Sequence, residues 1–303
     1  MIELAVILLR LVQYSAASVL MGSALFFVYA LPARGPASAA SLRWAKPLLI
    51  GAALMLAAGT LLGLALQTEM LADELSAEAL TAVVTQMDLG KAAVARAALA
   101  LIAAICAMVV PRGRTLWLGT GVLGSLACAT FGWMGHGAAT EGGGHTLHLV
   151  ADVLHALAAA GWIGALVAFA ALAAPPGQEP ERLSALSAAL QRFSPVGISL
   201  VAALAATGLV NVWYLIGTDV AAVLRDPYAQ LLALKLVLFT AMLALAALHR
   251  QRSVPALAAT LETNLLPQGD VLASLRRSLF GEAALGLAVL AAVAWLGTLA
   301  PPA

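Results

Sequence analysis

Hydrophobic residues form long, almost uninterrupted runs along the whole chain, and short polar segments separate them. A transmembrane helix needs about 20 mostly apolar residues to cross a hydrocarbon core of about 30 Å. Runs of this kind cover residues 4–31, 45–67, 89–110, 115–134, 146–173, 193–217, 228–249 and 279–300. The pattern predicts an all-α, polytopic integral membrane protein, built as a helical bundle of about eight transmembrane helices.

The composition supports this prediction and excludes a soluble domain. Of the 303 residues, 62% are hydrophobic and 10% are charged, whereas a soluble domain carries about 25% charged residues. We therefore expect residues 1–303 to form a single transmembrane domain, with spans 1 to 4 in residues 1–134 and spans 5 to 8 in residues 135–303. Two connections are long: an acidic one at 68–88, and one at 250–278 that we expect to form a helix on the inner membrane face.

Basic residues are concentrated in every second connection. The first, third, fifth and seventh loops contain Arg34, Arg43, Lys46, Arg112, Arg114, Arg182, Arg192, Arg250, Arg252, Arg276 and Arg277. In membrane proteins the cytoplasmic loops carry the excess of Lys and Arg. These odd-numbered loops are therefore predicted to be cytoplasmic, which puts both chain termini on the outer, periplasmic side.

The segment GGGHTLHLVADVLHAL, residues 142–157, contains three of the five histidines in the chain. At about 100° per residue, its ionisable side chains project from one arc of about 80° on the predicted fifth span. We name this set the polar stripe; its members are His145, His148, Asp152 and His155. Ionisable groups inside a membrane are costly and normally face the bundle interior or a water-filled cavity, so the polar stripe is expected to face inward.

The spacing within the polar stripe suits a series of two-residue sites. The helix rises about 15 Å from His145 to His155, so one ion does not reach all four side chains. Side chains three or four residues apart can share a ligand, which predicts a ladder of sites from the outer surface to near mid-membrane. At the outer end, His136 lies across a glycine-rich loop and is a candidate ligand with His145 or His148, and Met134 is a possible additional ligand.

Imidazole and carboxylate ligands suit Zn, Cu, Ni or Fe, and a thioether favours Cu(I). The residues alone therefore predict a transition-metal site without selecting the metal. Two other interpretations stay open at this point. The polar stripe can join helices by hydrogen bonds, since buried polar groups need partners, and Asp152 with His155 can form a proton relay.

Three cations are predicted in the outer parts of other spans: Arg10 in span 1, Arg96 in span 3 and Lys235 in span 7. Positive charges beside the polar stripe would repel the metal cation that the stripe is predicted to bind. We expect one or more of them to pair with Asp152 or with a carboxylate of the second loop when no metal is bound, or to extend along the helix to the outer interface.

Histidines on two helices with cations nearby are also typical of a membrane cytochrome. In that alternative, haem b has His136 and either His148 or His155 as axial ligands, and an Arg or Lys binds its propionates. The remaining histidine, His249, falls at the inner end of span 7 and does not add a second ligand at mid-membrane.

The segment HLVADVLHALAAAGWIGAL, residues 148–166, closely resembles the segment typical of the copper resistance protein D (CopD) family. Two more segments support the resemblance: RFSPVGISLVAALAATGLVNVWYLIG at 192–217 and DPYAQLLALKLVLFTAMLALAALHRQRSVPAL at 226–257. The residues in register are Asp152, His155, Trp162, Gly164, Gly208, Asn211 and Lys235. Together the segments cover most of the second half of the chain, and the first half agrees with the family in hydropathy.

The resemblance implies a bacterial inner-membrane protein of copper homeostasis that takes copper from the periplasm to the cytoplasm. It also implies a periplasmic copper chaperone as partner, which we expect to be a separate protein because the chain begins with a span. Asn211, Lys235 and Trp162 are expected to orient ligands or to line the pathway. The valence of the copper ion stays open, because the sequence has no Met-rich cluster.

Four sulfur and imidazole side chains are predicted towards the cytoplasmic side and are a candidate exit site for Cu(I): Cys106, Met108, Met242 and His249. Packing is the alternative for the methionines. The chain contains no GxxxxGK[ST] phosphate-binding loop and no catalytic constellation, so we expect neither ATP-driven pumping nor enzyme activity, and nothing indicates nucleic-acid binding. Three functions remain: a copper importer, a haem-binding electron carrier, and a copper-binding scaffold that does not transport.

Overall fold

The computed structural model describes residues 2–32, 35, 38–135, 143–174, 180–216, 226–262 and 269–300. Within these ranges the regular structure is helical, with no strand. In chain order the elements are α1 (Ile2–Ser18), the π turn η1 (Val19–Ser23), α2 (Ala24–Tyr29), η2 (Ala39–Ser41), α3 (Ala45–Ala72), α4 (Ala77–Gln86), α5 (Asp88–Val109), α6 (Arg114–Ala129), the 3₁₀ turn η3 (Thr130–Met134), α8 (His145–Ala173), α9 (Pro180–Ile216), α11 (Pro227–Glu262) and α12 (Gly269–Leu296).

The predicted spans are confirmed. In the described ranges, 8 helical segments are long and apolar enough to cross a membrane. Two of them are composite, because η1 continues α1 into α2 and η3 continues α6. Each hydrophobic run in the sequence thus corresponds to one span, and the fold class is an all-α membrane bundle.

One of the two long connections differs from the expectation. Helix α11 continues to Glu262 and α12 begins at Gly269, so the described part of the connection at 250–278 extends these two helices and contains no separate helix. Extending a helix adds a hydrogen bond for each residue fixed, whereas a new helix needs a costly nucleus. The acidic connection at 68–88 contains α4, which is capped by Ser76 Oγ accepting from the amide of Ala79 at 3.1 Å.

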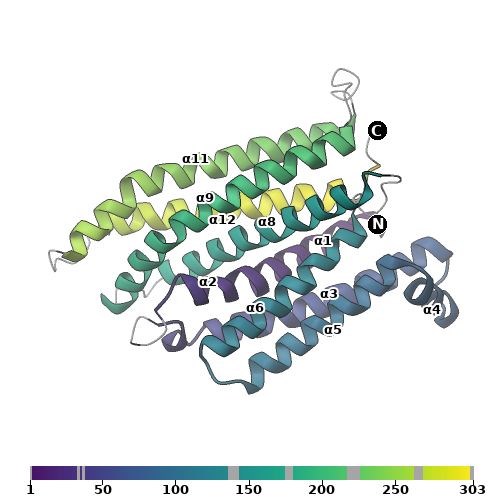
Figure 1. The fold of residues 1–303 in the computed structure, drawn as a ribbon, viewed down its shortest axis with the longest axis horizontal. Helices are drawn as coiled ribbons and strands as arrows, with labels where there is room; N and C mark the ends of the chain where they lie inside the picture. The colour runs from purple at the N-terminus through teal and green to yellow at the C-terminus, as the bar shows by residue number, and fades with distance from the viewer. Residues whose placement is uncertain are drawn as a thin grey trace.

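The spans lie side by side, and α1 begins and α12 ends at the end of the bundle where α4 lies and α8 begins (Figure 1). We name this the histidine end, because His145 is the first residue of α8. Helix α1 lies at the centre and contacts α3, α8 and α12. Helix α9 packs along α8, and α11 packs along α12.

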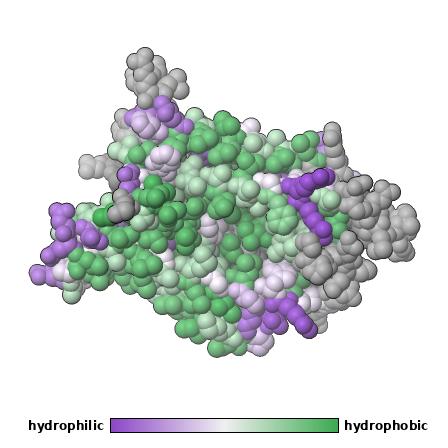
Figure 2. Space-filling model, turned by 180° about the vertical axis from the view of Figure 1, so that it is seen from behind, coloured by the Kyte–Doolittle hydropathy of each residue, from purple (hydrophilic) through white to green (hydrophobic). Residues whose placement is uncertain are grey.

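The outside of the bundle is apolar. Figure 2 shows hydrophobic residues across the middle of one face, with hydrophilic residues gathered towards its edges. Leu209 and Trp213 on α9 and Val237 on α11 are among the most exposed large apolar side chains. Such a surface is compatible with acyl chains, because no polar group has to give up water there.

The interior away from the histidine end is filled by aromatic rings. Phe27 contacts Trp117 edge-on with centroids 5.1 Å apart, and Phe26 contacts Phe169 in the same way at 4.7 Å. These rings are buried together with the alanines and leucines of the main core. The stripe residues on α8 therefore lie in the half of the bundle that this aromatic core does not fill.

The first span and α8 cross where Gly22 of η1 lies against Gly164 of α8. A Cβ atom on Gly164 would lie 2.5 Å from the Cα of Gly22 and 2.6 Å from the amide nitrogen of Ser23. Ser23 Oγ also donates a hydrogen bond to the carbonyl of Gly164 at 2.8 Å. Small residues allow this close approach between membrane helices. The crossing occurs at the π turn η1 and fixes α8, with its polar stripe, against the first half of the chain.

Candidate metal site on helix α8

The polar stripe was predicted to face inward. In the structure His148, Asp152 and His155 face helix α9. His148 is 1% exposed and stacks on Tyr214, with ring centroids 4.7 Å apart and an interplanar angle of 10°. Asp152 Oδ1 accepts a hydrogen bond from Asn211 Nδ2 at 3.2 Å. One turn further along, the ring of His155 contacts Thr207.

These contacts form three matched rungs between two antiparallel helices. The stripe residues follow one another at spacings of four and three, and their partners on α9 run in the opposite direction at spacings of three and four. Both sets therefore cover two turns of helix. The rungs are His148 with Tyr214, Asp152 with Asn211, and His155 with Thr207.

The third rung determines which nitrogen of His155 carries the proton. Thr207 Oγ1 lies 3.0 Å from His155 Nδ1, and the hydroxyl donates its proton to the carbonyl of Ala203 at 2.6 Å. A hydroxyl has a single proton to donate. With its own proton given to Ala203, Thr207 is placed to accept from Nδ1–H of His155, and this tautomer has the imidazole lone pair on Nε2.

Asp152 is the meeting point of several elements. Its Oδ2 lies against Gly135 at the end of η3, where a Cβ would come within 2.6 Å of that oxygen. Lys235 and Tyr228 of α11 lie within electrostatic range of the same carboxylate, and the charge of Lys235 also acts on His155. A carboxylate, an imidazole and an ammonium group from two helices thus share one neighbourhood.

Asn211 is only partly satisfied. Its Nδ2 donates to Asp152, but its Oδ1 is buried without a hydrogen-bond partner. An amide oxygen without a partner is a free acceptor for a cation or a proton donor. The expected role of Asn211 beside the ligands is therefore geometrically possible in this arrangement.

The structure does not assemble a closed metal site from the predicted ligands. Among the described residues, no three His, Cys, Asp or Glu side chains lie close enough together to bind one metal ion. His145 is half-buried at the start of α8, and His136 lies outside the described residues. Met134 turns its sulfur to the guanidinium of Arg96, which donates to it at 2.9 Å.

The candidate exit group is not brought together. Met108 is 49% exposed on α5, on the flank of the bundle formed by the first half. Met242 is buried beside α12 and packs with Trp162 and Leu166. Cys106 is half-buried on α5, and the side chain of His249 lies outside the described part of the structure. Helical packing separates the sulfur atoms because α5 and α11 occupy opposite flanks of the bundle (Figure 1).

Two residues of the site were not predicted from the sequence. Thr207 and Tyr214 lie on α9 and contact two histidines of the polar stripe. Their spacing from Asn211, four residues and three residues, is the signal that would have found them. The haem alternative gains no support, because His136, one of its two axial ligands, lies outside the described residues.

Comparison with known proteins agrees with the resemblance predicted above. A family model described as copper resistance protein D-like, N-terminal domain, matches residues 1–147, and one described as copper resistance protein D matches residues 187–296. Copper resistance protein D of Pseudomonas syringae pv. tomato is 34% identical over 97% of this chain and 96% of its own length. Copper transport protein CutJ of Bacillus subtilis (strain 168) is 29% identical over 55% of this chain and 28% of its own length. No solved structure matches the chain.

Proposed function

The chain belongs to the copper resistance protein D family, and from this premise we propose that it binds copper on the polar stripe of α8 and imports it across the bacterial inner membrane. Family membership and the apolar helices make it a multi-pass membrane protein of copper homeostasis. The ligands, the direction of transport and the inner membrane as its location are parts of the proposal.

The orientation of His155 carries the proposal. Histidines that bind metals usually donate their second ring N–H to an acceptor, which fixes the tautomer and turns the lone pair to the ion. The tautomer of His155 that donates Nδ1–H to Thr207 has this arrangement, because its lone pair is on Nε2. Asp152 lies three residues earlier on the same face of the helix, so its carboxylate and Nε2 can share one copper ion.

The spacing of the stripe supports movement of the ion along α8. Capture occurs at the histidine end, on His145 and His148, and the ion then passes to Asp152 and His155. Successive ligands are three or four residues apart, which corresponds to a rise of about 4.5–6 Å per step. Steps of this size let an ion exchange one ligand before it loses the previous one.

The surroundings of the histidine end favour delivery of cations from the periplasm. The excess of basic residues in the odd-numbered loops supports a periplasmic location for this end. Asp73, Glu74 and Glu78 are exposed near α4 and attract cations to the same surface. A separate periplasmic copper chaperone is the proposed donor of the ion.

A metal analysis combined with a flux measurement tests the proposal. The wild-type protein, purified in detergent with copper, is compared with an Asp152→Asn, His155→Gln double variant and with Asp73→Asn, which removes an exposed carboxylate at the same end. We expect copper on the wild type and on Asp73→Asn, and its loss from the double variant. In proteoliposomes, copper should accumulate only with the two proteins that bind it.

Each other result contradicts a defined part of the proposal. Copper on all three proteins would show that Asp152 and His155 are not needed to bind it. Copper binding without flux would leave a scaffold that does not transport. A Soret absorption band, with iron at haem stoichiometry, would reject the copper proposal in favour of the cytochrome alternative.

A further inference from the structure

A second polar site lies in the first half of the chain, around a fully buried arginine. Arg96 of α5 is 0% exposed. Its Nε donates to Thr130 Oγ1 at 2.8 Å, its Nη2 to the carbonyl of Thr130 at 3.1 Å, and its Nη1 to Gln13 Oε1 at 3.1 Å and Met134 Sδ at 2.9 Å. The ring of Phe131 covers Cζ at 3.8 Å. All of these contacts are neutral, so none of them compensates the charge of the guanidinium.

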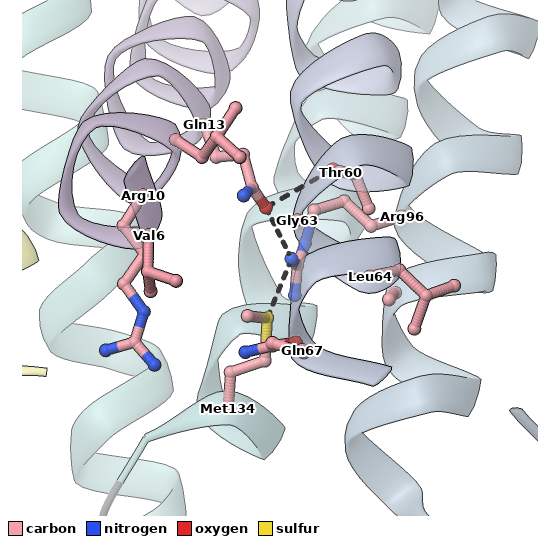
Figure 3. A pocket seen from close by; sticks show the side chains of 11 residues that line it. Val6, Arg10, Gln13, Thr60, Gly63, Leu64, Gln67, Arg96 and Met134 are labelled. Atoms are coloured by element: carbon pink, nitrogen blue, oxygen red, sulfur yellow. Dashed lines mark hydrogen bonds between the residues drawn. The ribbon is translucent and has the colours of Figure 1, made fainter. Parts of the chain in front are cut away.

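A second arginine faces the same cavity. Figure 3 shows Arg10 of α1 on one side and Arg96 on the other, with Gln13 and Gln67 between them. The Nε of Arg10 is buried without a hydrogen-bond partner. None of the side chains that line the cavity is a carboxylate, and both arginines stay charged because a guanidinium is not deprotonated in proteins.

The groups around the cavity are mostly hydrogen-bond donors. Gln13 Oε1 and Met134 Sδ already accept from Arg96, and Thr60 Oγ1 donates to the same Gln13 oxygen at 3.4 Å. Gln13 turns its amide nitrogen to Gly63, where a Cβ would come within 2.9 Å of Nε2. The acceptor atoms of Gln13 and Met134 are thus used within the protein, while the buried Nε of Arg10 lacks a partner and both arginines line the cavity.

We propose that this cavity binds a small monovalent anion of the halide class, with chloride as the ligand. Burial of a charge without a counter-charge is costly, and an anion accepts hydrogen bonds without offering any. The free space is about 10 Å³, which holds one water-sized group. That size favours a single-atom anion over sulfate, phosphate or a lipid headgroup.

The anion site is next to the polar stripe. Met134 is followed directly by Gly135, which packs against Asp152, and Tyr14 lies within electrostatic range of Arg10, Arg96 and Asp152. A bound anion therefore lowers the positive potential near the carboxylate of the stripe. This consequence rests on the proposed copper function, whereas the anion site itself does not.

Chloride binding is measured without copper, so the result is independent of the copper proposal. Purified protein in gluconate buffer is dialysed to equilibrium against radioactive chloride. We expect saturable binding of one chloride per chain, which bromide displaces and sulfate does not. In Arg10→Gln the affinity should fall at least about tenfold, as expected for loss of a charge-assisted hydrogen bond.

Two further variants make the result decisive. Gln67→Leu keeps both charges and removes one amide, so it should weaken chloride binding less than Arg10→Gln does. Arg112→Gln removes an exposed arginine at the opposite end and should bind chloride like the wild type. Absence of saturable binding, equal binding in Arg10→Gln and the wild type, equal loss in Arg112→Gln, or displacement by sulfate would each overturn the proposal.

Discussion

Substitution of Thr207 by valine tests the orientation of His155 directly. Valine matches threonine in shape but has no hydroxyl, so Nδ1–H of His155 loses the acceptor that lies 3.0 Å away. An imidazole with no fixed acceptor can move its proton to Nε2, and the lone pair then points away from the proposed copper ion. Loss of such a supporting hydrogen bond typically weakens metal binding by about 10–100-fold.

The assay is a competition between the purified protein and a chromogenic copper chelator of known affinity. We expect Thr207→Val to bind copper about 10–100-fold more weakly than the wild type. Thr207→Ser keeps the hydroxyl and should stay within a few-fold of the wild type. His155→Gln removes the ligand itself and sets the lower limit of the series.

The stability of Thr207→Val provides a control on the same argument. A buried N–H without an acceptor costs about 1–3 kcal/mol, which should lower the thermal unfolding midpoint in detergent without abolishing the fold. If Thr207→Val binds copper as tightly as the wild type while His155→Gln does not, the ring orientation is irrelevant to binding and the reasoning fails. If all the variants bind equally, His155 is not a ligand.

Three further substitutions test other parts of the structure. Gly164→Ala places a methyl group against Gly22 and should cost about 1–3 kcal/mol in thermal unfolding, whereas Gly119→Ala, whose Cβ meets nothing within 4 Å, should not lower the midpoint; equal midpoints would contradict the close crossing. Lys235→Met removes a positive charge near Asp152 and should tighten copper binding in the chelator competition; weaker binding would assign Lys235 a supporting role. Asn211→Asp puts a second carboxylate opposite Asp152, so its unfolding midpoint should fall in chelator and rise with copper more than that of the wild type; no response to copper would count against a cation at this rung.

The membrane spans and the direction of the polar stripe were predictable from the sequence because both depend on local patterns. A run of about 20 apolar residues is sufficient for a span, and 100° per residue is sufficient to align His148, Asp152 and His155. The partners on α9 were also within reach of this reasoning. Thr207 and Asn211 repeat the spacing of the stripe, so two polar faces with matched intervals predict that α8 and α9 pack against each other.

Contacts between distant helices were not predictable. Ser23 and Gly164 are 141 residues apart, and their hydrogen bond depends on the π turn at which α1 crosses α8. Met134 was a candidate ligand because of its place next to the glycine-rich loop, but its sulfur accepts from Arg96 of α5. Such a choice between two partners follows from the packing of three helices, and no single segment of sequence contains it.

The pairing of the stripe with α9 explains how polar groups stay in the bundle before copper binds. The hydrogen bonds of Asn211 and Thr207 offset much of the cost of burying Asp152 and His155. On the proposed function, copper binds Nε2 of His155 without breaking the bond to Thr207, whereas it competes with Asn211 for Asp152. In that case the Asn211 amide rotates, so that Oδ1 faces the ion in place of Nδ2. We expect α9 to be the helix that adjusts, because only a small part of its apolar span is buried in the bundle, whereas more than half of that of α8 is buried.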